Sequence, residues 1–507
     1  MHDEWPAPHC FEPSAPLAVN PRAAESYVLL VPGSATAQPL PRPTNLSSSG
    51  KGLDLMPRPS LRIAVVAYHF PPSPSVGAQR PGRWVAELRS RGLDVQVVTA
   101  SLSAEAGDRR HPGADPWVHD VPVRWDPRRL WAKLKRKLGA GKAVAPPQVD
   151  AAGFHNFAPP RRMPFLRRHV DAWFWLPDDR QGFIVPAARK VLALHRASPF
   201  DAIYVSGPPF SAHVAGLIAS RLTGVPLWVE YRDPWLEGKD QHTEAYSAPA
   251  THVERKLERH ILAHAQGAVV ATPGIATMLY SKLADTQHSK VTVTYNGIPS
   301  LSPTDSQPRL QASPRLTFLY AGTLYLGRDP RGLLEGLSAL HRAGRIDAAS
   351  VRLLLVGHCR YFRGESVQSM ASSLQLDGIV DLQDPVSSSA AGELMLSADV
   401  LVLLAQDQPA QIPQKLFDYL GTRKPILAFA DRGGEVDRLL DQVGGHVVVT
   451  DGASTDAVGE AIEKVMRLAM DGMQRGSPEV LERLTAERQL GTLAHHFIDR
   501  VAAITGR

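Results

Sequence analysis

The fold is decided by residues 61–92, which read LRIAVVAYHFPPSPSVGAQRPGRWVAELRSRG. The run from Ile63 to Ala67 is short and continuously apolar, as in strands that a parallel sheet buries on both faces. A proline-rich loop containing Gly77 follows, and an apolar pattern of helical spacing from Trp84 to Leu88 then ends at Gly92. The order strand, loop, helix predicts the first unit of an alternating α/β domain.

Similar apolar runs recur along the chain, and most of the gaps between them are long enough for crossover helices. We therefore predict a first parallel α/β domain over residues 61–297. A stretch rich in proline and serine follows and indicates an interdomain linker over residues 298–315. The further strands of the first domain are expected at 95–98, 202–205, 227–229, 268–270 and 291–293.

A second series of apolar runs predicts a C-terminal domain over residues 316–478, followed by a helix at 479–507 that returns to the N-terminal domain. The fold class is therefore α/β, with two Rossmann-like domains whose parallel sheets face a central cleft. Open α/β sheets bind ligands outside the carboxyl ends of their strands, so we expect the functional site in that cleft. The strands are expected at 316–320, 352–356, 400–404, 426–429 and 447–449.

The amino-acid composition indicates a globular protein. The chain has 507 residues, 44% hydrophobic and 21% charged, which suits a globular protein with more than one core. Residues 1–60 hold 11 of the 43 prolines and no sustained apolar period, so they are predicted to be a disordered extension. The two cysteines, Cys10 and Cys359, are too few and too far apart to indicate a disulfide framework or a cysteine-rich metal site.

Several functional classes lack their sequence signatures. No apolar run approaches the ~18 residues of a membrane-spanning helix, and the N-terminus does not have the pattern of a secretory signal, so we expect a cytoplasmic protein. The net charge of +6 favours anionic partners. Motifs of P-loop nucleotide hydrolases, serine hydrolases and zinc proteases are all missing from the sequence.

Two loops of the first domain carry candidate functional residues. Gly77 lies where the first loop enters a helix, and it permits a phosphate to approach the free N–H groups of the helix start. A structural turn stiffened by prolines is the alternative. Arg232 and Asp233 follow the apolar run that ends at Val229, where they could orient sugar hydroxyls or stabilise positive charge at an anomeric carbon. A salt bridge that closes the loop is the alternative.

The loop after the first strand of the second domain contains Gly322, Thr323 and Arg328. It has the same place in its domain as the Gly77 loop has in the first. Arg328 offers a permanently charged, bidentate contact to a diphosphate. A solvated surface arginine is the alternative.

A second candidate segment of this domain starts at Pro413, which is expected to open a helix. Lys415 then lies in the first turn, and Asp418 lies three residues further on the same face. A carboxylate at that place can accept hydrogen bonds from both ribose hydroxyls, although a surface ion pair with Lys415 is the alternative. A lysine in the first turn opposes the helix dipole, which suits a site that holds a phosphate.

Residues 124–142 contain eight lysines or arginines and one acidic residue, Asp126. On a helix, Leu130, Trp131 and Leu134 share one face, which predicts an interfacial helix on an anionic membrane surface. The protein would then be peripheral at the inner face of the cell membrane. A solvated helix packed on the sheet is the alternative. No nucleic-acid-binding module is recognisable, so a nucleic acid partner is not expected.

From Arg62 to about Val501 the chain resembles the GT-B glycosyltransferases of family four, the retaining group that builds bacterial surface glycans. The motifs that carry this resemblance are the loop Phe70-Pro71-Pro72 with Gly77 and Arg80, Pro177-Asp178, Val205 to Pro209, Arg232 to Trp235, Asn296-Gly297, Gly322 to Tyr325, and Pro413 to Leu420.

The resemblance implies a UDP-sugar, GDP-sugar or similar donor bound by the C-terminal domain, no obligatory metal or cofactor, and an acceptor held by the N-terminal domain. Asp418 matches the second carboxylate of the family's E-x7-E motif and is expected on the ribose. Arg328 and Lys415 are expected on the diphosphate. Ala410 stands at the place of the first glutamate, so an acidic contact to the donor sugar is missing there.

The sequence thus predicts a glycosyltransferase that moves a sugar from a nucleotide-sugar donor to a glycan or lipid-linked acceptor in surface polysaccharide biosynthesis. Arg328, Lys415 and Asp233 are the expected catalytic residues. The expected donor-binding residues are Gly77, Arg232, Gly322, Thr323, Pro413 and Asp418. A noncatalytic nucleotide- or glycan-binding protein, or a sugar-nucleotide epimerase of the same fold, is the alternative.

Overall fold

A computed structural model gives the structure of the chain. It describes residues 61–73, 75–101, 115–123, 173, 176–237, 248–299, 301, 315–325, 327–473 and 475–507. The predictions for residues 1–60, for the basic segment 124–142 and for most of the linker lie outside the described residues.

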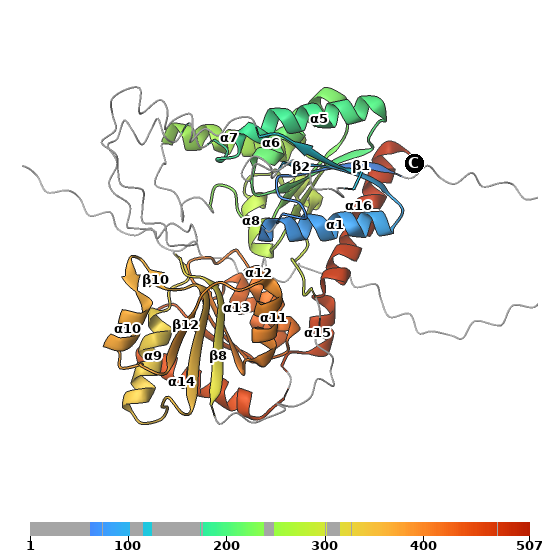
Figure 1. Cartoon of the computed structure of the whole chain (residues 1–507). Coiled ribbons are helices and arrows are strands. Elements are labelled where there is room, and N and C mark those ends of the chain that lie inside the picture. The colour runs from blue at the N-terminus through green and yellow to red at the C-terminus, as the bar shows by residue number, and fades with distance from the viewer. Residues whose placement is uncertain are drawn as a thin grey trace, which may run out of the picture. The chain divides into compact units, whose positions relative to one another are not determined.

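The N-terminal domain is built on a sheet of seven parallel strands in the order β3-β2-β1-β4-β5-β6-β7 (Figure 1). Every apolar run predicted to be a strand of this domain is one. The strands are β1 (Arg62–Ala67), β2 (Asp94–Ala100), β3 (Val118–Val121), β4 (Ala202–Gly207), β5 (Leu227–Tyr231), β6 (Gly267–Val270) and β7 (Val291–Val293).

Helices cover both faces of this sheet. The helices α5, α6, α7 and α8 enclose one core cluster, and α1 with the C-terminal helix α16 encloses the other. The bounds are α1 (Gln79–Ser90), α5 (Ile184–Ala197), α6 (Ser211–Thr223), α7 (Ala248–His264), α8 (Pro273–Tyr280) and α16 (Ala486–Thr505), with 3-10 turns at Val76–Ala78, Gln181–Phe183 and Asp285–Lys290.

The C-terminal domain repeats this plan with six parallel strands in the order β12-β9-β8-β13-β14-β15. The strands are β8 (Leu316–Thr323), β9 (Val351–His358), β12 (Val380–Gln383), β13 (Val400–Ala405), β14 (Ile426–Ala430) and β15 (Val447–Thr450), and a hairpin of β10 (Tyr361–Phe362) and β11 (Glu365–Ser366) is separate. The helices are α9 (Arg331–Arg342), α10 (Val367–Ser373), α11 (Ser388–Ser397), α12 (Gln414–Gly421), α13 (Glu435–Val443), α14 (Thr455–Met470) and α15 (Pro478–Arg483).

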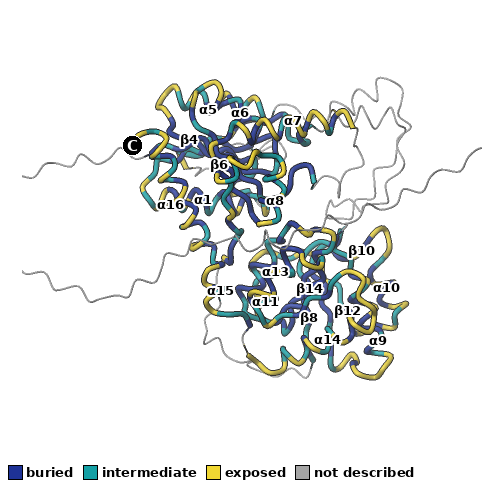
Figure 2. The backbone as a smooth tube through the Cα atoms, turned by 180° about the vertical axis from the view of Figure 1, so that it is seen from behind, coloured by how far each residue is buried: buried dark blue, intermediate teal, exposed yellow. Residues whose placement is uncertain are grey.

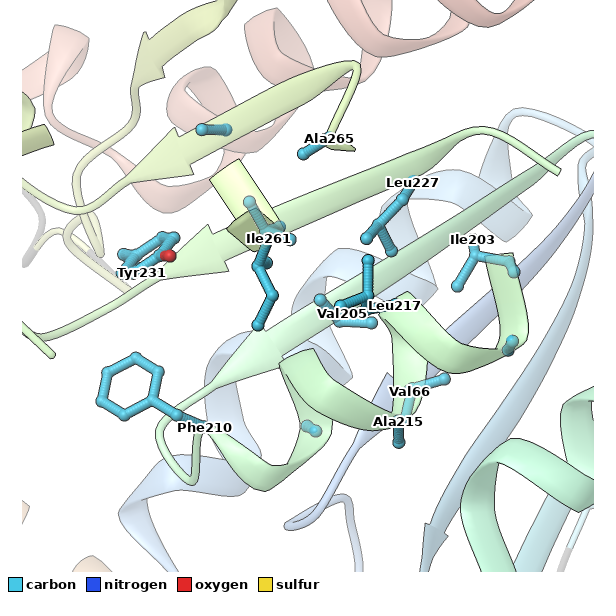
Figure 3. Packing of buried hydrophobic residues seen from close by; sticks show 14 of the residues in the cluster. Val66, Ile203, Val205, Phe210, Ala215, Leu217, Leu227, Tyr231, Ile261 and Ala265 are labelled. Atoms are coloured by element: carbon cyan, nitrogen blue, oxygen red, sulfur yellow. The ribbon is translucent and has the colours of Figure 1, made fainter. Parts of the chain in front are cut away.

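Continuous burial explains why the apolar runs become central strands. All six residues of β4 and all six of β13 are buried, and the tube in Figure 2 is dark blue around β4. Figure 3 shows one face of the N-terminal core, where Val205 and Ile203 of β4 meet Leu217 of α6 and Leu227 of β5. Such packing holds the carboxyl ends of the strands rigidly at one edge.

The last helix joins the two halves of the chain. Although α16 follows the C-terminal domain, its Leu493 and Phe497 belong to the N-terminal core, and the Phe497 ring centre lies 5.7 Å from that of Trp84 on α1. Figure 1 shows α16 beside α1. Ile298 pairs with Thr485 just before this helix, so the chain leaves the N-terminal domain and returns to it at neighbouring points.

In both sheets the strand order reverses beside the first strand of the domain, between β1 and β4 and between β8 and β13. Ligand crevices form at such points. Across the described residues, no helix combines the length and the hydropathy needed to span a bilayer.

Candidate functional site

Helix α12 places two predicted site residues beside the end of β8. Pro413 is the residue before the helix, with an extended ψ of 140°, and the helix itself begins at Gln414. Leu416, Phe417, Tyr419 and Leu420 are buried and hold α12 on the sheet. Lys415 therefore sits in the first turn, as predicted, with Asp418 one turn further on.

The ammonium group of Lys415 lies over the aromatic ring of Tyr320, 4.4 Å from its centre. It occupies space that exists because residue 322 is glycine, since a Cβ there would come within 1.6 Å of Nζ. The Nζ atom is buried and has no hydrogen-bond partner in the described part of the chain. Burial, together with the charge of Arg328, lowers the pKa of Lys415 to about 7.

Arg328 lies in the loop after β8, with its guanidinium 4.2 Å from the centre of the Tyr325 ring. Its Nη1 donates a long hydrogen bond of 3.5 Å to the carbonyl of Thr323, which also accepts a bond of 2.8 Å from the Tyr320 hydroxyl. The Nε atom of Arg328 is buried and lacks a partner among the described residues. Lys415 and Arg328 thus place two positive charges with unused hydrogen-bond donors close together. Burying such groups costs free energy unless an anion binds between them and accepts their hydrogen bonds.

Asp418 is half-buried next to these cations. Its Oδ1 accepts a 3.4 Å hydrogen bond from Gln414 Nε2. Burial raises the pKa of Asp418, and the Gln414 bond and the positive charges of Arg83 and Lys415 oppose that rise. An ionised carboxylate in this position can accept two hydroxyl groups.

In the N-terminal domain, Arg232 fastens two loops at the point where the strand order reverses. Its guanidinium donates to the carbonyls of Gly77 in the loop after β1, of Gly207 at the end of β4 and of Pro208 just after β4. A Cβ on Gly77 would lie 3.2 Å from the Arg232 Nη1, so the glycine makes room for the arginine. The roles of Gly77 and Arg232 in donor binding stay predictions.

Asp233 faces the C-terminal domain instead of pairing with Arg232. Its Oδ1 accepts a hydrogen bond of 2.9 Å from Gln411 Nε2. Next to Gln411, the carbonyl of Ala410 accepts a bond of 2.6 Å from Thr272 Oγ1. A Cβ on Gly274 would lie 2.8 Å from the Cα of Ala410. The segment where the family resemblance expects a glutamate is therefore packed against the start of α8.

Arg80 and Glu230 form a buried ion pair of 2.7 Å behind this site. Arg80 also donates to the carbonyls of Thr294 and Tyr295 and to the side chain of Asn296. Burial alone would raise the pKa of Glu230, but the Arg80 charge and the hydrogen bond from Ser206 hold it below its usual value. This pair ties helix α1 to the segment that leaves the domain.

Four residues of the site were not predicted from the sequence. Tyr320 supports Lys415, Tyr325 supports Arg328, and the Cys359 thiol donates to the carbonyl of Gly322 at 3.3 Å. Arg83 lies on α1 and acts on Asp418 electrostatically. Tyr325 ends the motif Gly322 to Tyr325 that the sequence analysis names, although no role was predicted for it there, and Arg83 follows Arg80 by one helical turn.

The structure thus brings six predicted residues together in the C-terminal domain: Gly322, Thr323, Arg328, Pro413, Lys415 and Asp418. It places Gly77 and Arg232 together in the N-terminal domain, and Asp233 at the contact with Gln411. Among the described residues, no group of three or more histidine, cysteine or acidic side chains could hold a metal ion. The chemistry of the C-terminal group is that of a site for a polyanion with adjacent hydroxyls.

Comparison with known proteins gives one family match and several structural matches. Residues 77–297 match the family described as Glycosyl transferase 4-like domain. No curated protein matches the chain. Solved structures match at low sequence identity but over nearly the whole chain.

Sucrose-phosphate synthase from Thermosynechococcus elongatus is 14% identical with a TM-score of 0.55, and the match covers 88% of this chain and 100% of that one. HepE from Anabaena, solved with UDP and glucose, is 13% identical with a TM-score of 0.52 over 87% and 100% of the two chains. The lipopolysaccharide outer core galactosyltransferase WaaB is 12% identical with a TM-score of 0.51 over 87% and 100%. The chain therefore has the GT-B fold, and the match over residues 77–297 supports its assignment as a glycosyltransferase.

Proposed function

We propose that this protein transfers a sugar, with retention of configuration, from a nucleotide-sugar donor to a glycan or lipid-linked acceptor in surface polysaccharide biosynthesis. One observation carries the proposal: the buried Lys415 Nζ and Arg328 Nε lie beside Tyr320 and Thr323 without hydrogen-bond partners in the described part of the chain. A diphosphate satisfies both. The structural neighbour HepE was solved with UDP-glucose, which favours a UDP-sugar, and a GDP-sugar is the next candidate.

The charges suit the departure of a nucleoside diphosphate. As the glycosidic bond to the donor breaks, negative charge grows on the leaving phosphate, and the fixed cations Arg328 and Lys415 stabilise it. Asp418 accepts the ribose hydroxyls, while Gly322, Thr323 and Pro413 bring the backbone close to the nucleotide. The nucleotide sugar is a substrate in this scheme, and the transfer proceeds without a metal or other cofactor.

Asp233 is the carboxylate that we place nearest the sugar. Gln411 holds it at 2.9 Å from the side of the C-terminal domain, and Arg232, next to it in sequence, fixes its loop. We assign Asp233 to stabilise positive charge at the anomeric carbon, with Gly77 and Arg232 shaping the sugar end of the donor site.

The protein is further proposed to work in the cytoplasm, peripherally at the inner face of the cell membrane, through residues 124–142. Eight basic residues and the apolar face of that segment carry this proposal. Replacing the basic residues between Arg128 and Lys137 by glutamine should abolish binding to vesicles that contain anionic lipid. Unchanged binding would rule the segment out as the membrane contact.

The activity is tested by incubating the wild-type protein with a panel of UDP- and GDP-sugars, with and without glycan and lipid-linked acceptors. Product formation that needs an acceptor, with the donor's anomeric configuration kept in the product's NMR spectrum, supports the proposal. Conversion of the donor sugar without any acceptor would identify an epimerase. Nucleotide binding without turnover of any donor would identify a noncatalytic protein, the alternative that the alanine at position 410 suggests.

A further inference from the structure

One face of the N-terminal domain exposes charges of a single sign. It is formed by α5, α6 and α7, which pack next to one another on the same side of the sheet. Ser220 on α6 and His264 at the end of α7 share a hydrogen bond of 2.9 Å. Figure 2 shows the three helices together, with exposed residues of α5 and α7 in yellow. The structure describes every residue of these helices, and all their exposed lysine, arginine and acidic side chains are basic: Arg189, Arg196, Arg221, Arg255, Lys256 and Arg259.

The acidic residues of these helices are buried beneath the face. α5 and α6 contain none, and α7 contains Glu254 and Glu258. Oε1 of Glu254 accepts a hydrogen bond of 2.6 Å from Trp235 Nε1, and both oxygens of Glu258 accept bonds of 2.9 Å from Lys282 Nζ. Within the part of the chain that the structure describes, none of the six exposed cations forms an ion pair. Their charges therefore add at the surface.

An ordinary solvated helix in this protein mixes both signs of charge. On α14, the exposed cations Lys464 and Arg467 are accompanied by the exposed acids Asp456 and Glu460. Such a helix surface is close to neutral and needs no partner. Like charges gathered on one face repel one another, and an anionic partner relieves that repulsion. The charge of the face formed by α5, α6 and α7 therefore calls for an anionic partner.

Exposed aliphatic side chains among the cations indicate which anionic partner fits. Val185 on α5, Leu222 on α6 and Val253 on α7 are exposed by 49%, 66% and 43%. Such side chains gain free energy by entering the boundary between lipid headgroups and acyl chains, while lysine and arginine meet anionic headgroups. Surfaces for single-stranded nucleic acid present aromatic rings for stacking, whereas these three helices contain no phenylalanine, tyrosine or tryptophan. The composition of the face suits a lipid surface.

We propose that the face formed by α5, α6 and α7 docks on an anionic lipid bilayer. The six cations lie against the headgroups, and the three aliphatic side chains enter the boundary beneath them. This inference deepens the proposed location at the inner face of the cell membrane, on which it rests, and names a contact separate from residues 124–142. It sets the N-terminal domain against the membrane that would carry a lipid-linked acceptor.

The test is co-sedimentation of the full-length protein, without donor, with vesicles of phosphatidylcholine and phosphatidylglycerol and with vesicles of phosphatidylcholine alone. The variant Arg255→Gln/Lys256→Gln/Arg259→Gln removes three charges from α7. A second variant, Leu222→Ser/Val253→Ser, removes two of the exposed aliphatic side chains and keeps every charge. All five positions are exposed, and thermal unfolding checks that each variant is folded.

Two further variants separate this face from other charges of the chain. Arg342→Gln/Lys464→Gln/Arg467→Gln is the matched control, because it removes three exposed cations from α9 and α14 of the C-terminal domain. The other replaces the basic residues between Arg128 and Lys137 by glutamine. A single-stranded RNA homopolymer, titrated into wild type, tests the other kind of polyanion.

We expect wild type to bind the vesicles that contain phosphatidylglycerol and not those of phosphatidylcholine alone. The triple variant on α7 should bind the anionic vesicles about a hundredfold more weakly, as three basic contacts to the surface are lost. Leu222→Ser/Val253→Ser should weaken binding by about tenfold. The control on α9 and α14 should bind like wild type, because charges farther from the surface than a Debye length are screened.

The outcomes separate this face from the proposed membrane location. If only the variant between Arg128 and Lys137 loses binding, the protein is still a membrane protein of the peripheral kind, but α5, α6 and α7 do not form the contact. Equal losses in the α7 variant and its matched control would also overturn the inference. If wild type binds no anionic vesicle, the inference and the proposed location both fail, and binding of RNA in that case would identify a nucleic acid as the partner of the face.

Discussion

A Cβ atom on residue 322 would lie 1.6 Å from the Nζ of Lys415, so the ammonium group rests in space that Gly322 leaves open. Gly322 is one of the last two residues of β8, and Lys415 lies in the first turn of α12. The position of the lysine therefore depends on two segments that are far apart in the sequence. Burial lowers the pKa of this ammonium group to about 7.

Replacing Gly322 by alanine should displace the end of the Lys415 side chain, and at a φ of +157° the new side chain also strains the backbone at residue 322. We expect donor affinity to fall by roughly tenfold or more, as one charge-assisted contact is lost. Calorimetry with UDP measures this. Gly392→Ala is the control, since its Cβ would meet nothing within 4 Å in helix α11. Equal affinities in the two variants would show that the space at residue 322 is unimportant.

Burial of Lys415 also predicts a dependence of stability on pH in the absence of donor. Its folded pKa is about 7, below its ordinary value of 10.5, so the unfolded chain binds more protons between these values and stability increases with pH there. Lys415→Met should remove this contribution. The difference in unfolding free energy between wild type and Lys415→Met should change by at most about 1.4 kcal/mol per pH unit above pH 7. A difference that does not vary from pH 6 to pH 9 would contradict the buried environment of the ammonium group.

Arg232 should matter strongly for stability. Its guanidinium donates to three backbone carbonyls, that of Gly207 at the end of β4 and those of Gly77 and Pro208 in the loops after β1 and β4. Arg232→Ala leaves the carbonyls of Gly77 and Pro208 without this donor. We expect a loss of about 3 kcal/mol in chemical denaturation. If Arg232 only contacted the donor, unfolding would be unchanged while donor affinity fell, and that pattern would refute this structural role.

The buried pair Arg80–Glu230 should protect the protein against acid. Because the pKa of Glu230 is held below its ordinary value of 4.5, its stabilisation is fully present above that value and is lost as the pH falls through the folded pKa. Glu230→Gln should cost about 3–5 kcal/mol at neutral pH, since it leaves Arg80 buried without its ion partner. Urea unfolding from pH 7 to pH 3 measures both effects.

Glu87→Gln is the matched control for the buried pair, because Glu87 pairs with Arg91 on the surface of the same helix, with 21% of its side chain exposed. That substitution should cost about 0.5 kcal/mol or less. Similar losses of unfolding free energy in the two variants would mean that burial of the Arg80–Glu230 pair adds nothing to stability.

The sequence was most informative where strands are continuously apolar. β1, β4 and β13 are buried along their length, and their composition alone predicted them. The strands β3 and β12 were missed because each is at the edge of its sheet and only one of its four residues is buried. A half-exposed edge strand carries polar residues and lacks the apolar signal.

Some features of the candidate site could likewise be predicted from local sequence, and others could not. Lys415 and Asp418 could be predicted because both lie within one helical turn, where spacing fixes which side chains share a face. The contact of Lys415 with Gly322 depends on packing between distant segments. Local sequence carries no signal for such contacts.

The central claim is that Lys415 and Arg328 hold the diphosphate of a nucleotide donor. Calorimetric titration of wild type and Lys415→Ala with UDP and GDP tests it most directly, with Lys424→Ala as a control for the loss of one lysine nearby. The claim predicts that wild type binds at least one of the two nucleotides and that Lys415→Ala weakens that binding by tenfold or more, corresponding to about 1.4 kcal/mol. Equal affinity for the nucleotide in wild type and Lys415→Ala would contradict it.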